Sequence, residues 1–275
     1  MFESYLFEQS AAQYTNRIMI HDCDGFEERI HLGQLYEAKG FQVLPYVDDL
    51  HFRVEQYGKL EMSEEKIAVI VHPGQYIPYD IRQRFTHYTL SYASLFPRLN
   101  AAALKNNKSL NLDLLAMTYR ECFTDLTVRQ LTEQFIKRNV YAKRNIEKYI
   151  QLSTDELNNK CACAQNYMDW LLIAEKKAEI DVMATAYDVQ IDSAQFNVPF
   201  LTFIEKSFGK LSASNSRTSP VIVSRAMEYM HDHSEKFVVI VMDGMSEFDW
   251  HIIKSTFEGI RYSKTNIFAM IPTTT

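Results

Sequence analysis

Residues Lys66–His72 read KIAVIVH and are followed at once by Pro73-Gly74. A continuous, β-branched apolar run that stops at a turn signal is typical of a strand buried on both faces of a sheet. Strands of that kind occur mainly in parallel sheets covered by helices. The run therefore predicts an α/β domain around it.

The chain on the amino-terminal side of this run repeats the same pattern. Two further strand candidates precede it, Arg17–His21 and Phe41–Tyr46. The segments between the three candidates have helical character, since Phe26–Lys39 ends at a glycine C-cap and Asp48–Tyr57 begins on an acidic cap. An alternation of strands and helices at this spacing predicts a parallel sheet with right-handed crossovers.

The composition limits the class of protein. The chain has 275 residues, 47% of them apolar, which is enough for two modest domains with buried cores. A formal net charge of -6 argues against a broad nucleic-acid-binding surface. The start lacks the pattern of a signal peptide, no apolar run is long enough to span a membrane, and four cysteines are too few for a disulfide framework. We therefore expect a cytoplasmic protein.

The middle of the chain has a helical rhythm. Residues 93–208 form long periodic segments, and within them Val128–Leu152 predicts one helix, with the next opening at Ser153. Residues 209–236 predict a linker, rich in serine near its start, followed by a short helix. These apolar stripes are interpreted as core packing.

The last forty residues contain the chemistry. Phe237–Met242 (FVVIVM) is a second continuous apolar run, and Asp243-Gly244 follows it directly. A helical stretch and a further apolar run, Asn266–Ile271, come next, and the chain then reads PTTT over residues 272–275. This order predicts a β-α-β unit, which would place Asp243 and the threonines at the carboxyl edge of one sheet, where open α/β sheets bind ligands.

A carboxylate and a hydroxyl at one sheet edge suggest metal-assisted chemistry. A threonine hydroxyl is a weak nucleophile until a divalent cation lowers its pKa, and Asp243 could supply one ligand to that cation. Gly244 would let the backbone turn away after the ligand. The alternative is that Asp243 merely caps a helix in an ordinary α/β protein.

The segment FVVIVMDGMSEFDW, with IPTTT downstream, resembles the start of a PglZ domain of the alkaline phosphatase superfamily. The resemblance implies that Asp243 binds the catalytic metal, zinc or manganese. It implies that Thr275 is the nucleophile and a second metal contact, with Thr274 as the alternative if the register shifts by one residue. Residues 237–275 would then be the start of an alkaline-phosphatase-like core, represented by its first β-α-β unit.

The amino-terminal part also resembles the domain that precedes PglZ domains, which is receiver-like. Residues 1–92 contain DCDGF, VLPYVDDLHFR and YIPYDIRQRF, the segments that carry this resemblance. A receiver has a phospho-accepting aspartate after its third strand, but this chain has His72-Pro73 there. We interpret the domain as a degenerate receiver used for contacts. The alternative is a cation bound at Asp22 and Asp24.

PglZ proteins belong mainly to BREX systems, which defend bacteria against phages. The resemblance implies a metal-dependent phosphatase or phosphodiesterase that acts beside a methyltransferase and an ATPase, on a phosphate ester or a nucleic acid. The superfamily's remaining metal ligands follow its nucleophile, so we expect this chain to be an amino-terminal portion that binds metal weakly and is inactive alone. The alternative is a docking and assembly module of the defence complex without hydrolase activity.

Overall fold

The computed structural model describes residues 1–62, 65–213, 220–257, 262 and 264–269. The chain forms two compact units, residues 1–146 and residues 147–275, each with its own core. The division between them falls inside the predicted helical region 93–208, within one long helix, α11 (Lys143–Cys163).

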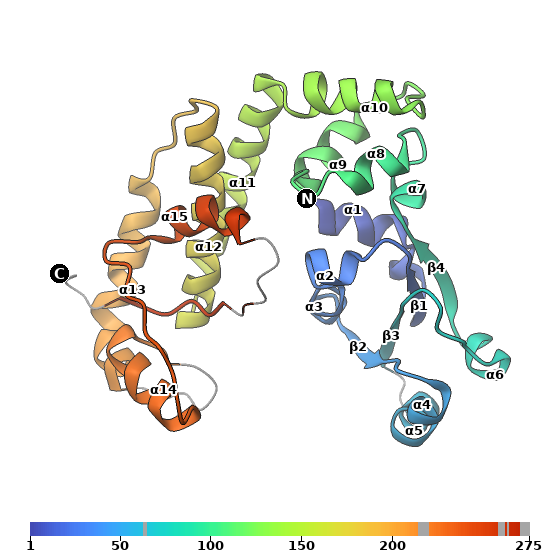
Figure 1. Cartoon of the computed structure of the whole chain (residues 1–275), viewed down its shortest axis with the longest axis horizontal. Helices are drawn as coiled ribbons and strands as arrows, with labels where there is room; N and C mark the ends of the chain where they lie inside the picture. Colours follow the sequence, from blue (N-terminus) through green and yellow to red (C-terminus); the bar gives the residue numbers. More distant parts are fainter. Residues whose placement is uncertain (63–64, 214–219, 258–261, 263, 270–275) are drawn as a thin grey trace. The chain divides into compact units, whose positions relative to one another are not determined.

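Unit 1 is built on a parallel sheet of four strands, in the spatial order β2-β3-β1-β4 (Figure 1). The α/β class and the parallel sheet predicted from the sequence are confirmed. The strands are β1 (Arg17–Asp22), β2 (Phe41–Pro45), β3 (Lys66–Val71) and β4 (Thr86–Leu90).

Helices cover the sheet and extend unit 1 beyond it. The helices before β4 are α1 (Phe2–Gln9), α2 (Phe26–Ile30), α3 (Leu32–Ala38), α4 (Asp49–Glu55), α5 (Tyr57–Met62) and α6 (Tyr79–Arg82), with a 3-10 turn, η1, at Ala12–Tyr14. Those after β4 are α7 (Tyr92–Leu95), α8 (Ala101–Asn106), α9 (Leu112–Arg120) and α10 (Arg129–Phe135), and α10 continues into a π-helical turn, η2, at Ile136–Val140.

The central strand β3 explains why this sheet is stable. Its Ala68 lies in register with Ile18 of β1 on one side and Val43 of β2 on the other. Because side chains alternate along a strand, Ile67 and Val69 point to one face of the sheet, where they join an apolar cluster with residues of α4, α5 and α6. The opposite face meets the amino-terminal helices. A buried β-branched strand with both edges paired satisfies its backbone completely.

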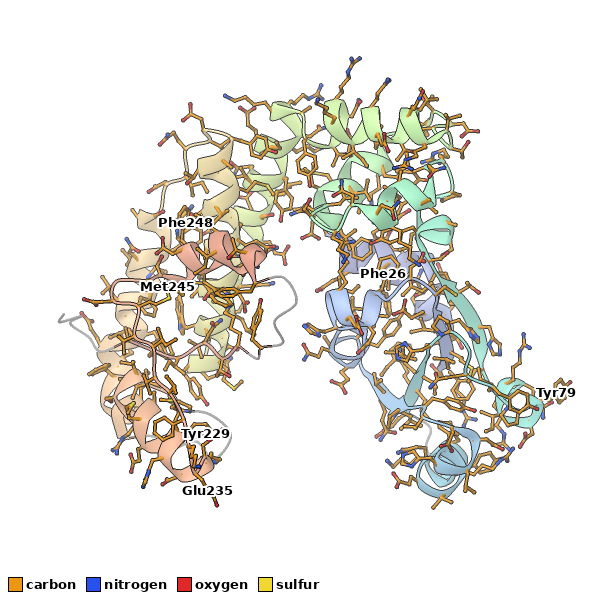
Figure 2. All side chains as sticks on the ribbon, in the orientation of Figure 1. Phe26, Tyr79, Tyr229, Glu235, Met245 and Phe248 are labelled. Atoms are coloured by element: carbon orange, nitrogen blue, oxygen red, sulfur yellow. The ribbon has the colours of Figure 1, made fainter. Side chains whose placement is uncertain are left out.

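Aromatic rings fill the layer between α1, α2 and α7. Phe2 stacks on Phe26 with ring centroids 6.0 Å apart, and Tyr5 stacks on Phe96 at 5.6 Å. Figure 2 contrasts Phe26, enclosed by its neighbours at 1% exposure, with Tyr79, which points away from the unit at 78% exposure. Burial of these large rings is a major source of stabilisation for unit 1.

The strand order corrects one part of the sequence-based expectation. Receiver-type doubly wound sheets run 2-1-3-4-5, whereas β3 here lies between β2 and β1. The connection from β1 to β2 therefore skips one strand position, which β3 later fills. Strand β4 pairs with the other side of β1. The sheet thus has another strand order than a receiver, and the predicted receiver-like architecture is not confirmed. The edge strand β4 was not expected, because its sequence THYTL is polar. In the structure most of its residues are exposed.

Two helix boundaries also differ from expectation. The predicted helix Phe26–Lys39 is split into α2 and α3 at His31, whose φ of 51° is left-handed. The predicted helix Val128–Leu152 is interrupted by the π-helical turn, and α11 runs through Ser153 without a break. Ser153 is buried at 4% exposure, so it does not act as an exposed cap there.

Unit 2 is helical in its described part. After α11 it contains α12 (Tyr167–Ala186), α13 (Ala194–Ala213), α14 (Ala226–His233) and α15 (Glu247–Ile253), with 3-10 turns η3 (Val223–Arg225) and η4 (Lys254–Thr256). The core includes Trp170, whose ring lies 5.4 Å from that of Phe200. Phe268 joins this aromatic group and makes an isolated parallel bridge to Ile222.

The predicted β-α-β unit is not formed in the described part of unit 2. Residues 237–242 have no strand assignment, and Val238 and Ile240 are 87% and 82% exposed. Of the predicted strand Asn266–Ile271, only Phe268 makes a bridge, and residues 270 and 271 lie outside the described residues. An apolar run becomes a strand only where neighbouring strands accept its backbone hydrogen bonds. The middle helix of the prediction is present as α15.

Candidate functional site

Asp243 is the one predicted site residue that the structure describes. It lies in an exposed turn with Gly244, whose φ is 71°. This left-handed conformation is the one that glycine adopts without strain, as the sequence predicted for the turn after the carboxylate. Thr274 and Thr275 lie outside the described residues. The predicted pairing of Asp243 with a threonine therefore involves residues that the structure does not describe.

The turn at Asp243 leads directly into a well-capped helix. Ser246 is the N-cap of α15, and its backbone N–H donates to Asp249 over 2.8 Å. The Ser246 hydroxyl donates to the same carboxylate at 2.6 Å, and these bonds hold the pKa of Asp249 below its usual range. This capping box fixes where α15 begins, and with it the direction of the side chains that follow.

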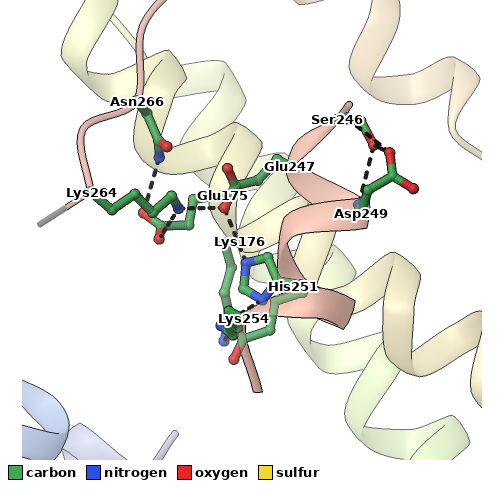
Figure 3. A network of polar contacts seen from close by, with 10 residues as sticks. Glu175, Lys176, Ser246, Glu247, Asp249, His251, Lys254, Lys264 and Asn266 are labelled. Atoms are coloured by element: carbon green, nitrogen blue, oxygen red, sulfur yellow. Dashed lines mark hydrogen bonds and ion pairs between the residues drawn. The ribbon is translucent and has the colours of Figure 1, made fainter. Parts of the chain in front are cut away.

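Beyond the cap, α15 presents two potential ligands on one face. Glu247 and His251 are four residues apart, and side chains at that spacing lie on the same side of a helix. They meet Glu175 of α12 (Figure 3). The ligand atoms of Glu175, Glu247 and His251 all lie within 4.8 Å of one another. We call these three residues the EEH cluster.

Lys264 supplies positive charge to the EEH cluster. Its Nζ donates to Oε1 of Glu175 over 2.9 Å and also contacts Glu247. The Nδ2 of Asn266 reaches the other oxygen of Glu175 at 3.4 Å. Burial opposes the charge of Lys264, but its hydrogen bonds to Glu247 and Glu175 outweigh that effect and raise its pKa. A cation therefore bridges the two carboxylates.

His251 is the most enclosed member of the EEH cluster. Its side chain is 9% exposed, and Nε2 lies 3.3 Å from Oε1 of Glu247. That approach lacks the angle of a hydrogen bond, so Nε2 is buried without a hydrogen-bond partner among the described residues. Lys254 lies 2.9 Å from the other ring nitrogen, Nδ1. Burial first, and then the charge of Lys254, lower the pKa of His251, which favours neutral imidazole.

A cleft of about 530 Å³ opens beside the EEH cluster. Both carboxylates and Lys264 line it, together with the rings of Trp250 and Tyr262. A small anionic or aromatic molecule could reach the charged groups from this side. Carboxylate oxygens and a neutral imidazole are also the donor set that divalent transition metals accept.

The acidic pair of unit 1 is used for structure. Asp22 is fully buried and accepts hydrogen bonds from the backbone N–H groups of Phe26 at 2.9 Å and Glu27 at 2.8 Å. Asp24 accepts from the backbone of Tyr92 and pairs with Lys105 at 2.8 Å. Asp22 thus accepts hydrogen bonds from the first N–H groups of α2, and Asp24 links the loop before α2 to α7 and α8. These contacts argue against the alternative of a cation bound at the pair.

Sequence reasoning did not identify the EEH cluster. The spacing of Glu247 and His251 was visible, but a glutamate and a histidine four apart occur on many helices. Glu175 lies on a different helix, far away in the sequence, and Lys264 follows α15 in a loop. No local pattern connects these residues, because only the packing of α15 on α12 brings them together.

No family model, curated protein or solved structure matches this chain. Among the helices that the structure describes, none has both the length and the apolar character required to cross a bilayer.

Proposed function

We propose that the chain belongs to a PglZ-family protein whose chemistry is metal-dependent hydrolysis of a phosphate ester or phosphodiester. The observation that carries the proposal is the exposed Asp243, presented on a left-handed Asp-Gly turn immediately before the capped helix α15. The turn and the helix of the strand-Asp-Gly-helix motif on which the resemblance rests are present, whereas residues 237–242 before them form no strand. In this proposal Asp243 is a metal ligand and Thr275, or alternatively Thr274, is the nucleophile.

The metal of the proposed family is zinc or manganese. Asp243 offers one exposed carboxylate, and it does not belong to the group of three potential ligands found among the described residues. A single carboxylate is a poor fit to a catalytic metal, because affinity rises with the number and charge of ligands. We therefore derive no catalytic step through a metal at Asp243.

The proposed setting is a cytoplasmic phage-defence complex of the BREX type. Its partners would be a methyltransferase and an ATPase, and its substrate would be a phosphate ester or nucleic acid. The helices and the α/β sheet of residues 1–236 would then serve mainly for contacts with those partners.

A second candidate, a docking module without hydrolase activity, is favoured by a specific observation. Residues 237–242 expose several large apolar side chains, among them Val238 and Val241 at 87% and 81%. Exposed contiguous apolar surface is characteristic of a surface that binds another protein. In this reading the run contacts a partner of the defence complex.

The two candidates differ in the activity that they expect of the protein. It should be purified and assayed with bis-p-nitrophenyl phosphate in Mn²⁺ or Zn²⁺. The hydrolase proposal expects turnover that Asp243→Asn and Thr275→Ala reduce to background, while Thr274→Ala retains it.

The opposite result would support docking. The hydrolase proposal would be contradicted if the protein showed no turnover and if Val238→Lys and Ile240→Lys abolished binding to the purified ATPase or methyltransferase. Loss of turnover in Thr274→Ala but not in Thr275→Ala would move the nucleophile by one residue.

A further inference from the structure

We propose that the EEH cluster, Glu175, Glu247 and His251, is a binding site for a divalent transition metal, with the Lys264 ammonium as the cation that competes for it. This site does not include Asp243, and its three residues have no part in the proposed hydrolase function.

The first argument is geometric. Ligand atoms from three side chains lie within 4.8 Å of one another, which allows one small cation to reach all three after minor side-chain rotations. Two ligands come from one face of α15 and the third from α12, so helix packing rather than a loop positions them (Figure 3). Three protein ligands with further positions open are the usual composition of a reactive zinc site.

The second argument is independent and concerns His251. Its side chain is 9% exposed, and its Nε2 is aimed at the carboxylate of Glu247 without forming a hydrogen bond. Buried polar atoms are nearly always satisfied, so an unpartnered one requires an explanation. A cation between Nε2 and the two carboxylates would satisfy the imidazole and both acids.

Lys264 shows that this location favours positive charge. Its ammonium contacts Glu175 and Glu247, and its side chain is 24% exposed, so it can withdraw toward the cleft. A dication would compensate the two carboxylates more fully than one ammonium. Because the metal and Lys264 need the same oxygens, they compete, and removal of the lysine charge should strengthen metal binding.

Lys254 sets a second condition for binding. A lysine ammonium that donates to Nδ1 leaves the ring hydrogen on Nε2. For Nε2 to bind metal, the hydrogen must move to Nδ1, and Lys254 must give up this contact. An imidazole ligand also selects the metal, because Zn²⁺ and Co²⁺ accept nitrogen, whereas Mg²⁺, Ca²⁺ and Mn²⁺ prefer oxygen ligands.

The test uses the full 275-residue chain after treatment with a chelator. Zn²⁺ binding is measured by calorimetry, and Co²⁺ binding by its visible absorption, which reports nitrogen ligation and coordination number. We expect one saturable equivalent of either metal. Glu175→Gln and His251→Gln should each weaken binding by at least about tenfold, since even loss of a residue that only supports a ligand costs 10–100-fold. Lys264→Met should strengthen it.

The matched control is the double variant Glu228→Gln with His231→Gln. These residues are also a glutamate and a histidine on one helix, α14, but they are exposed and lack a third ligand among the described residues. Their replacement should leave the affinity unchanged. Circular dichroism of every variant checks that the helices persist. If Glu175→Gln fails to fold, His251→Gln remains as the test, because replacing a neutral imidazole by an amide does not change the charge of the cluster.

Three results would overturn the proposal. One is the absence of saturable Zn²⁺ or Co²⁺ binding by the wild-type chain. Another is loss of binding in Asp243→Asn with full binding in the cluster variants, which would place the metal at the turn instead. The third is an unchanged or weakened metal affinity in folded Lys264→Met, which would contradict competition between the ammonium and the metal for the two carboxylates.

Discussion

Two apolar runs of nearly the same composition differ in structure in this chain. Residues 66–71 (KIAVIV) form β3, the buried centre of a sheet, whereas residues 237–242 (FVVIVM) form no strand and are largely exposed. Ile67 is fully buried and Ile240 is 82% exposed. The comparison teaches that β-branched apolar sequence provides the tendency to form a strand, but neighbouring strands decide whether one forms.

The difference lies in the backbone. Every residue of β3 from Lys66 to Ile70 has a register partner on β2, and most also have one on β1. Within the described residues, 237–242 have no such ladder. A strand without partners has to leave its N–H and C=O groups to water, and its apolar side chains then gain little from an extended conformation.

The largest expected effect is in amide hydrogen exchange. Amides of residues 66–71 should exchange more slowly than those of residues 237–242 by on the order of 10³ or more, because central strands open only by global unfolding. Mass spectrometry of peptic fragments measures both segments in one sample. Equal protection would show that residues 237–242 pair as a strand in solution and would remove the contrast.

The second-largest expected difference is in stability, when one isoleucine of each run is truncated to alanine. Ile67→Ala should lower the free energy of unfolding of unit 1 by about 2–5 kcal/mol, since it opens a cavity in the apolar cluster. Ile240→Ala should change stability by no more than about 0.5 kcal/mol. Urea denaturation followed by circular dichroism measures both. A loss of similar size in the two variants would mean that Ile240 is buried in solution.

Two carboxylates offer a third comparison: Asp22 at the end of β1, and Asp243 directly after residues 237–242. Asp22→Ala should cost about 1–3 kcal/mol, because the buried N–H of Phe26 and the partly buried N–H of Glu27 lose their acceptor. Asp243→Ala, at an exposed turn, should have almost no effect on stability. The same denaturation measurement applies. Strong destabilisation by Asp243→Ala would indicate that this carboxylate has a structural role.

The smallest effect is a pH dependence in unit 1. His21 of β1 lies 2.9 Å from His87 of β4, and burial, then His87 and Arg82, lower its pKa. The unfolded chain therefore takes up a proton more readily. The stability contributed by neutral His21 is complete above its ordinary pKa of about 6.5 and is lost as pH falls below that value.

Unfolding measured from about pH 8 to about pH 5 tests this sign. His21→Gln should flatten the acid side of the curve, while Thr89→Val, in register with His21 on β4, should not. A curve for His21→Gln that is as steep as that of the wild-type chain would assign the pH dependence to other groups.

The sequence by itself determined the local structure of unit 1. Continuous apolar runs, the glycine after α3 and the acidic cap of α4 located β1, β2, β3 and the helices between them. The same local reasoning identified the Asp243-Gly244 turn and the helix after it, because a turn conformation and a cap depend on residues that are neighbours in the chain.

Only the tertiary structure decided the rest. The strand order, the polar edge strand β4, the exposure of residues 237–242 and the meeting of Glu175 with Glu247 and His251 all depend on contacts between distant segments. Local patterns report what a segment can form. Whether its hydrogen bonds and apolar surface find partners is settled by packing across the whole unit, and that information is not carried by any one segment.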